Sequence, residues 1–221
     1  MIAENLAIIK ETLPSDKVTL IAVTKTQSVA VIRKAFAAGL PVIGENKVQE
    51  AFEKSAQLSD LPLEWHLIGH LQTNKAKQAV SIFSLIHSVD SLKLATEIDR
   101  CAKNAAKVQD VLLQINVAGE ETKSGVAPQE ADEMVVLIDS LPNIRLCGLM
   151  TVAPFFDDPE QTRPIFREMS ALFKRLQKKV RRPESFRWLS MGMTHDYKVA
   201  VEEGSNMVRI GTGIFGAREP R

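Results

Sequence analysis

The sequence predicts a single α/β domain over residues 1–221, a (β/α)8 TIM barrel with an extra helix at its N-terminus. Strand-like and helix-like patterns alternate along the chain, and eight of the runs suit strands. Such alternation implies a parallel sheet covered by helices, and eight strands favour closure into a barrel. The alternative is an open, doubly wound sheet. That fold usually has fewer strands and a Gly-rich first turn, whereas this first turn reads Lys25-Thr26-Gln27.

Each element is predicted from its own pattern. The N-terminal tract MIAENLAIIKETL is an amphipathic helix with acidic residues, unlike a signal peptide. Short apolar, β-branched runs predict strands at Val18–Thr24, Pro41–Gly44, Trp65–Ile68, Leu85–Val89, Val111–Val117, Arg145–Met150, Phe186–Ser190 and Met207–Ile210. Helices are expected at Ala30–Ala38, Lys47–Gln57, Asn74–Ser81, Ser91–Ala106, Pro128–Ser140, Pro159–Val180 and His195–Glu203. No linker or repeat is visible, and we expect no second domain after the tract FGAREPR.

Composition narrows the classes of function. Hydrophobic residues make up 45% of the chain and the net charge is +1, so no global field favours nucleic acid or an anionic membrane. No apolar run approaches the length that spans a bilayer. The two cysteines, Cys101 and Cys147, are interpreted as buried, reduced thiols. These observations predict a cytoplasmic protein.

Polar residues gather where the predicted strands end, and in a barrel all these positions share one rim. They are Lys25, Glu45, Asn46, Gln72, Asn74 and Thr151. His70 and His195 are also expected at this rim, where they could touch a ligand. His66 and His87 lie within strand patterns and are interpreted as packing residues. The sequence contains no HExxH, CxxC, GxSxG or P-loop motif, so we expect no metal.

The tracts after the last two strands predict a phosphate site. SMGMTHD offers the Ser190 hydroxyl and a turn opened by Gly192, and RIGTG offers Gly211 and the Thr212 hydroxyl. Backbone N–H groups in such Gly-containing turns bind anions, and these loops are a recurrent phosphate site in (β/α)8 barrels. Either tract alone is more often a plain turn; their joint position favours the site.

Two basic residues need partners, Lys25 at the end of the first predicted strand and Arg209 within the last. Lys25 follows a buried strand on the rim that carries the phosphate site, which fits Schiff-base chemistry, because apolar surroundings keep a lysine amine neutral. The phosphate-bearing carbonyl compound could be pyridoxal 5′-phosphate (PLP) or a sugar phosphate. Arg209 could pair with a carboxylate, bind the phosphate or face a ring nitrogen. Lys123, in a polar loop, is a further candidate anion contact.

Seven tracts together resemble the PLP homeostasis proteins, the YggS/PROSC family, over nearly the whole chain. They are AVTKTQ, GENKVQE, WHLIGHLQTNK, KSG, GLMTVAP, LSMGMTHDY and VRIGTGIFG. Thr194 stands where serine is common in that family. A cyanobacterial member is a candidate for a closer match.

The resemblance implies the fold-type III PLP barrel, similar to the N-terminal domain of alanine racemase. It also implies that Lys25 carries PLP as a Schiff base and that Arg209 faces the pyridine nitrogen. The remaining implied PLP-binding residues are Asn46, Ser190, Met191, Gly192, Gly211 and Thr212. The implied function is PLP homeostasis and amino-acid and keto-acid balance, with PLP-dependent apoenzymes as possible acceptors.

We expect a monomer with little turnover. Racemisation needs a second base opposite the lysine, and the only tyrosine, Tyr197, is expected elsewhere. A PLP-dependent racemase and a Schiff-base aldolase are the alternatives.

Overall fold

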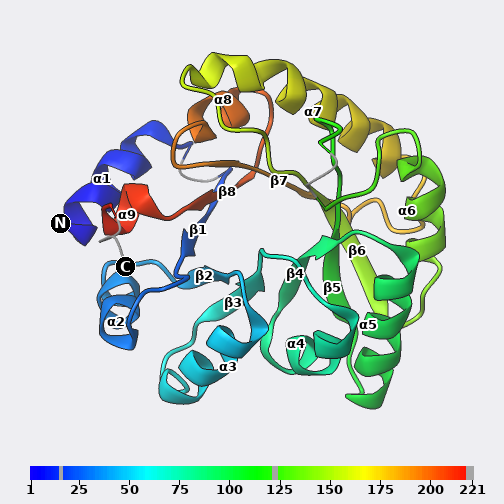
Figure 1. Cartoon of the computed structure of the whole chain (residues 1–221), viewed down its shortest axis with the longest axis horizontal. Helices are drawn as coiled ribbons and strands as arrows, with labels where there is room; N and C mark the ends of the chain where they lie inside the picture. Colours follow the sequence, from blue (N-terminus) through cyan, green and yellow to red (C-terminus); the bar gives the residue numbers. More distant parts are fainter. Residues whose placement is uncertain (15–16, 121–123, 218–221) are drawn as a thin grey trace.

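The computed structural model describes residues 1–14, 17–120 and 124–217 and forms a closed barrel of parallel strands (Figure 1). The strands lie in sequential order around the barrel, and β8 pairs with β1 to close it. They are β1 (Thr19–Val23), β2 (Val42–Glu45), β3 (Glu64–Leu67), β4 (Leu85–Val89), β5 (Gln109–Gln114), β6 (Ile144–Met150), β7 (Trp188–Met193) and β8 (Met207–Ile210).

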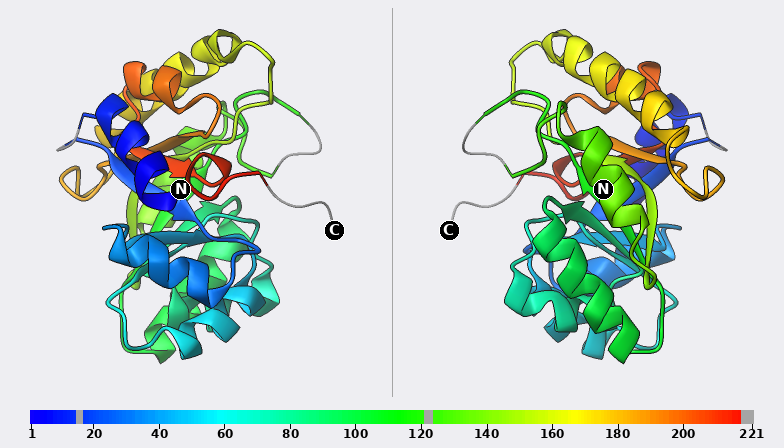
Figure 2. Two further views of the ribbon diagram at one scale, coloured as in Figure 1. Left: turned by 90° about the vertical axis from the view of Figure 1, so that its left-hand side faces the viewer. Right: turned by 90° about the vertical axis from the view of Figure 1, so that its right-hand side faces the viewer.

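Helices surround the barrel, as Figure 1 and the side views of Figure 2 show. The α-helices are α1 (Ile2–Thr12), α2 (Val29–Ala37), α3 (Val48–Gln57), α4 (Ala76–Ile82), α5 (Leu92–Asn104), α6 (Ala131–Asp139), α7 (Arg163–Gln177), α8 (Tyr197–Glu202) and α9 (Thr212–Phe215). Two 3-10 turns, η1 (Thr73–Lys75) and η2 (Pro159–Thr162), precede α4 and α7. Among the described residues, no helix has both the length and the apolar character needed to cross a bilayer.

The apolar core has two layers. The larger one fills the space between the strands and the surrounding helices, where residues such as Ile43, Ile86 and Phe166 are fully buried. The smaller cluster draws on strands on several sides of the barrel, so it lies in the interior that they enclose: Ile21, Leu85, Leu112, Cys147, Met150 and Met207. Cys101 and Cys147 are buried free thiols, as predicted. Side chains thus fill the barrel below the rim.

The predicted barrel is confirmed, and most element bounds agree within a few residues. The main difference is β7, which we expected at Phe186–Ser190 and which lies at Trp188–Met193. Gly192 caused the error, because it resembles a turn residue. It has a φ of +94°, next to a register shift in the β7–β8 pairing, and a Cβ there would lie 2.6 Å from Ala200 Cβ. The helix α9 was also missed, because its first residues, Thr212 and Gly213, have a turn-like composition.

Candidate functional site

Lys25 lies in the turn that follows β1, where its side chain is half-buried. The turn is strained, because Thr26 has a φ of +66°. Hydrogen bonds hold both flanks: the Thr26 N–H donates to the Glu50 carboxylate, and the Gln27 N–H donates to the Thr24 carbonyl at 3.0 Å. The backbone on both sides of Lys25 is therefore fixed by hydrogen bonds.

A buried ion cluster lies directly behind this turn. Lys54 Nζ is 2.7 Å from one carboxylate oxygen each of Glu45 and Glu50, and it also donates to the Thr24 carbonyl at 2.7 Å. Burial raises the pKa of Glu45, against hydrogen bonds from Lys54 and Thr24. Burial alone would raise the pKa of Glu50 as well. Hydrogen bonds from Lys54 and the Thr26 N–H outweigh burial, so the pKa of Glu50 is lowered overall. Sequence reasoning missed Lys54, which lies within an ordinary amphipathic helix pattern.

Arg209 lies inside the barrel, in β8, with only 3% of its surface exposed. Its Nη1 donates to Ser190 Oγ at 2.7 Å and its Nη2 to the Thr151 carbonyl at 2.8 Å. Burial lowers the pKa of Arg209 to about 10, and the charge of Asp196 opposes that shift. The guanidinium therefore remains charged at neutral pH, and the described residues place no carboxylate in a salt bridge with it.

Ser190 belongs to this interior group rather than to the rim. Its side chain is fully buried, and its hydroxyl contacts Arg209 and, at 3.0 Å, His87 Nδ1. The predicted contact of the Ser190 hydroxyl with a phosphate stays a prediction. The neighbouring Met191 side chain is also fully buried, in the outer apolar layer. Both positions follow from the extension of β7 through the tract that we expected to be a loop.

Thr194 lies where the phosphate site was predicted. Its Oγ1 accepts hydrogen bonds from the backbone N–H groups of Gly211 and Gly213, at 3.3 and 3.2 Å. Thr212 lies between these glycines, exposed at the start of α9. A Cβ on Gly213 would lie 3.0 Å from Thr194 Cγ2. The loops after β7 and β8 thus bring together a hydroxyl and two N–H groups, an arrangement suited to an anion. The sequence analysis singled out Thr194 only as a departure from the serine that is common in the family, and did not assign it to the phosphate site.

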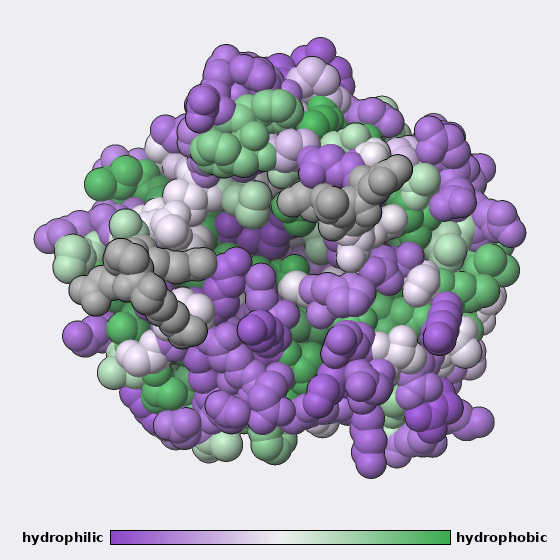
Figure 3. All heavy atoms as spheres, in the orientation of Figure 1, coloured by the Kyte–Doolittle hydropathy of each residue, from purple (hydrophilic) through white to green (hydrophobic). Residues whose placement is uncertain are grey.

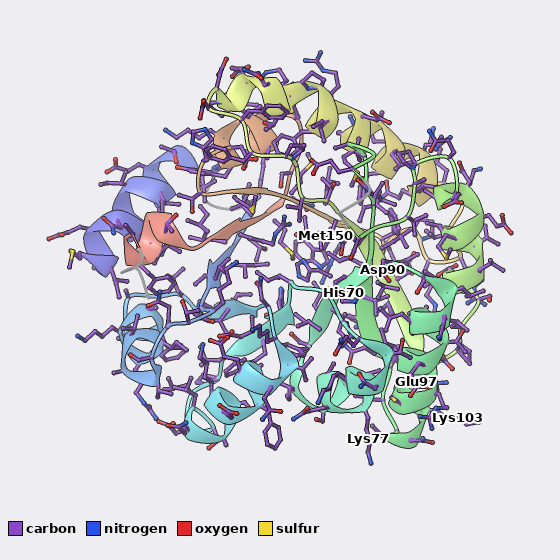
Figure 4. The ribbon with its side chains drawn as sticks, viewed as in Figure 1. His70, Lys77, Asp90, Glu97, Lys103 and Met150 are labelled. Atoms are coloured by element: carbon purple, nitrogen blue, oxygen red, sulfur yellow. The ribbon has the colours of Figure 1, made fainter. Side chains whose placement is uncertain are left out.

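The other predicted rim residues lie around the same end of the barrel. Asn46 and His70 line a cavity of about 320 Å³ together with Lys47, Val48, Gln49, Gln72 and Lys75. His70 Nδ1 is 3.4 Å from Asp90 Oδ2, and Figure 4 places both residues toward the centre of the barrel. Figure 3 shows hydrophilic side chains around a hollow in the middle of this face.

The structure was also compared with the expected positions of His195, Tyr197 and Lys123. His195 contacts the Asp157 carbonyl and the Phe155 ring. Tyr197 hydrogen-bonds Thr12 Oγ1 at 2.8 Å, so it joins α8 to α1 and is not part of the rim. Lys123 lies outside the described residues. In the described ranges, no group of three or more His, Cys, Asp or Glu residues is placed to hold a metal ion.

Comparisons with known proteins show which proteins this chain resembles. Residues 1–219 match the family model described as alanine racemase, N-terminal domain. The chain is 47% identical to the pyridoxal phosphate homeostasis protein of Aquifex aeolicus, over 90% of this chain and 87% of that protein. It is 36% identical to the protein of the same name in Escherichia coli K12, over 99% and 97% of the two chains.

Solved structures of PipY from Synechococcus elongatus are also similar to this chain. The structure without PLP has a TM-score of 0.91 at 40% identity and covers 98% of this chain and 100% of that one. The structure with PLP bound has a TM-score of 0.88 at the same identity and coverage.

Proposed function

The chain belongs to the pyridoxal phosphate homeostasis protein family, and from this premise we propose that it holds PLP on Lys25 as a cofactor carrier. The observation that carries the proposal is the position of two features on neighbouring strands. Lys25 follows β1, and the turn with Gly211 and Gly213 follows β8. A Cβ on Gly211 would lie 3.4 Å from Val23 Cβ, so the two strand ends are in contact.

The residues present fit PLP. Lys25 supplies the amine for the PLP aldehyde. The Thr194 and Thr212 hydroxyls hold the phosphate, and the N–H groups of Gly211 and Gly213, which now donate to Thr194 Oγ1, turn to a phosphate oxygen when it binds. Gly192 keeps the backbone of this loop pair in position, because a side chain there would displace α8. Asn46 lines the neighbouring cavity, on the β2 side.

Arg209 faces the pyridine nitrogen in this proposal. The guanidinium is charged, buried and held by Ser190 and Thr151, so it is fixed as a donor. A charged donor keeps the ring nitrogen unprotonated, and PLP supplies an electron sink that is weaker when its nitrogen is unprotonated. Thr151 thus acts through its backbone carbonyl, while its own hydroxyl donates to the Ile115 carbonyl at 2.8 Å.

This arrangement suits carriage of the cofactor better than turnover. The one tyrosine is committed to Thr12, so it does not serve as a second base opposite Lys25. We further propose that the protein is a cytoplasmic monomer of one domain and that PLP-dependent apoenzymes accept the cofactor. A PLP-dependent racemase is the second candidate, favoured by the match to the alanine racemase N-terminal domain model.

A borohydride experiment tests the proposal. The protein loaded with PLP should show a visible absorption band that borohydride removes, and peptide mass mapping should find the pyridoxyl group on Lys25. Attachment at Lys47 or Lys75, which line the neighbouring cavity, would contradict the assignment. A protein that stays colourless with PLP would contradict the function.

A further inference from the structure

A chain of hydrogen bonds crosses the interior of the barrel from Arg209 to the opposite end. From Ser190 Oγ, which accepts from Arg209 Nη1 at 2.7 Å, it continues to His87 Nδ1 at 3.0 Å. His87 Nε2 lies 3.1 Å from His66 Nδ1, and His66 Nε2 lies 2.9 Å from Glu64 Oε1. Glu64 is the first residue of β3 and is exposed, so the chain ends at the N-terminal face of the barrel.

The two ends give the chain a direction. A guanidinium only donates hydrogen bonds, and a carboxylate only accepts them. With both imidazoles neutral, one assignment satisfies every contact. In it Ser190 donates to His87 Nδ1, His87 Nε2–H donates to His66 Nδ1, and His66 Nε2–H donates to Glu64. Every proton then points away from the site, and the Ser190 oxygen presents a lone pair to Arg209.

The surroundings of His87 support a neutral ring. His87 is fully buried, and burial lowers its pKa well below the usual value, with the charge of Arg209 acting in the same direction. Two other charges lie near the ends of this hydrogen-bond chain. The charge of Arg187 lowers the pKa of Glu64, and the charge of Asp196 raises the pKa of Arg209. A proton added to His66 would reverse the direction, because both of its ring nitrogens would then donate.

We infer that His87 is a positioning residue for Arg209, which it holds through Ser190 in the orientation that faces the bound ring. The inference rests on the proposed function for the identity of the ring. Because His87 accepts the Ser190 proton, the Ser190 hydroxyl is kept from donating elsewhere and serves Arg209 as an acceptor. The sequence separation of 103 residues between His87 and Ser190 hid this role from pattern analysis.

Nitrogen-15 NMR of the histidine rings in the PLP-free protein tests the chain without any ligand. At neutral pH His66 and His87 should both be neutral with the proton on Nε2. The His66→Gln and His87→Asn variants assign the two sets of signals. A proton on His87 Nδ1 would overturn the inference, because Ser190 could not then donate to it.

The second measurement uses the PLP-loaded protein. His87→Phe removes the acceptor of the Ser190 proton, so PLP should dissociate about tenfold faster, the scale of one lost hydrogen bond, and the visible band should shift. His87→Asn keeps an acceptor at the Nδ1 position, so its PLP dissociation rate and visible band should lie close to those of the unaltered protein. Cys147→Ala is the control, because Cys147 is buried inside the barrel but takes no part in the chain of hydrogen bonds.

The outcomes are distinguishable. Equal dissociation rates and spectra for His87→Phe and Cys147→Ala would overturn the positioning role while leaving the proposed function intact. Failure of the unaltered protein to bind PLP would overturn the proposed function, and the NMR result would still decide whether the chain has the inferred direction. Should His87→Phe fail to fold, the ring tautomers and His87→Asn decide the matter.

Discussion

Lys54 Nζ donates a 2.7 Å hydrogen bond to the backbone carbonyl of Thr24, the residue that precedes Lys25. Lys54 also neutralises Glu45, whose carboxylate is fully buried. The cation therefore connects the stability of the α3 region to the position of the proposed PLP lysine. A residue without any role in PLP chemistry thus becomes important for the site.

Replacing Lys54 with methionine should lower the free energy of unfolding by about 3 kcal/mol, because it leaves Glu45 buried without its cation. Urea unfolding measures this value. Lys103→Met, an exposed change on α5 (Figure 4), should cost less than about 0.5 kcal/mol. A loss below about 1 kcal/mol for Lys54→Met would mean that the cluster contributes little to stability.

Thr194→Val should weaken PLP binding by about 1–2 kcal/mol, because it removes a hydroxyl that we place on a charged phosphate. Pyridoxal, which has no phosphate, should bind the variant and the unaltered protein equally. Thr96→Val, on the exposed face of α5, should leave both affinities unchanged. Equal losses for PLP and pyridoxal would remove Thr194 from the phosphate site.

His87 should make stability depend on pH. Its pKa in the folded protein lies well below the usual 6.5, so the unfolded chain binds a proton that the folded protein excludes. Relative to higher pH, the folded protein therefore loses stability as the pH falls below 6.5, because the unfolded chain is then favoured by binding the extra proton. From pH 7.5 to 5.5 the loss should be about 1.4 kcal/mol.

Urea unfolding of the unaltered protein and of His87→Asn at both pH values isolates the contribution of this histidine. The variant lacks the titrating group, so its stability should fall by about 1.4 kcal/mol less over the interval. Identical slopes for the two proteins would mean that His87 accepts a proton in the folded state.

The PLP-loaded protein should turn over amino acids far more slowly than about 1 per second, the low end for ordinary enzymes. Chirality and keto-acid release after incubation with L-alanine measure this rate. Turnover at enzyme rates would favour the racemase alternative. Tyr197→Phe would then show whether its hydroxyl takes part, since its contact with Thr12 predicts no effect on the rate.

The sequence was sufficient for the barrel because each strand and helix carries its own periodicity. It was also sufficient for placing Lys25 on the rim, since that residue follows the first strand directly. It was not sufficient for β7, which continues through Gly192 to Met193, where a side chain on Gly192 would collide with α8. The tract after Ser190 was therefore expected to be a loop, and the contact of the Ser190 hydroxyl with Arg209 was not foreseen.

Long-range contacts account for the other misses. His66 and His87 were interpreted as packing residues, and they are buried, but their polar partners come from other strands. Lys54 looks like any lysine of an amphipathic helix until Glu45 is placed beside it. Pairing across the fold decides such roles, and local pattern does not contain that information.

The contacts of α1 have a consequence for how the protein is made. Asn5 on α1 donates to the Ile214 carbonyl, 209 residues away, and Thr12 contacts Tyr197, 185 residues away. The β1–β8 pairing has a similar span. Contacts between the two ends of a chain form late, because a long loop must close first. The segment that carries Lys25 therefore leaves the ribosome well before the β8 segment, and the proposed PLP pocket forms only after Gly211 and Gly213 have emerged.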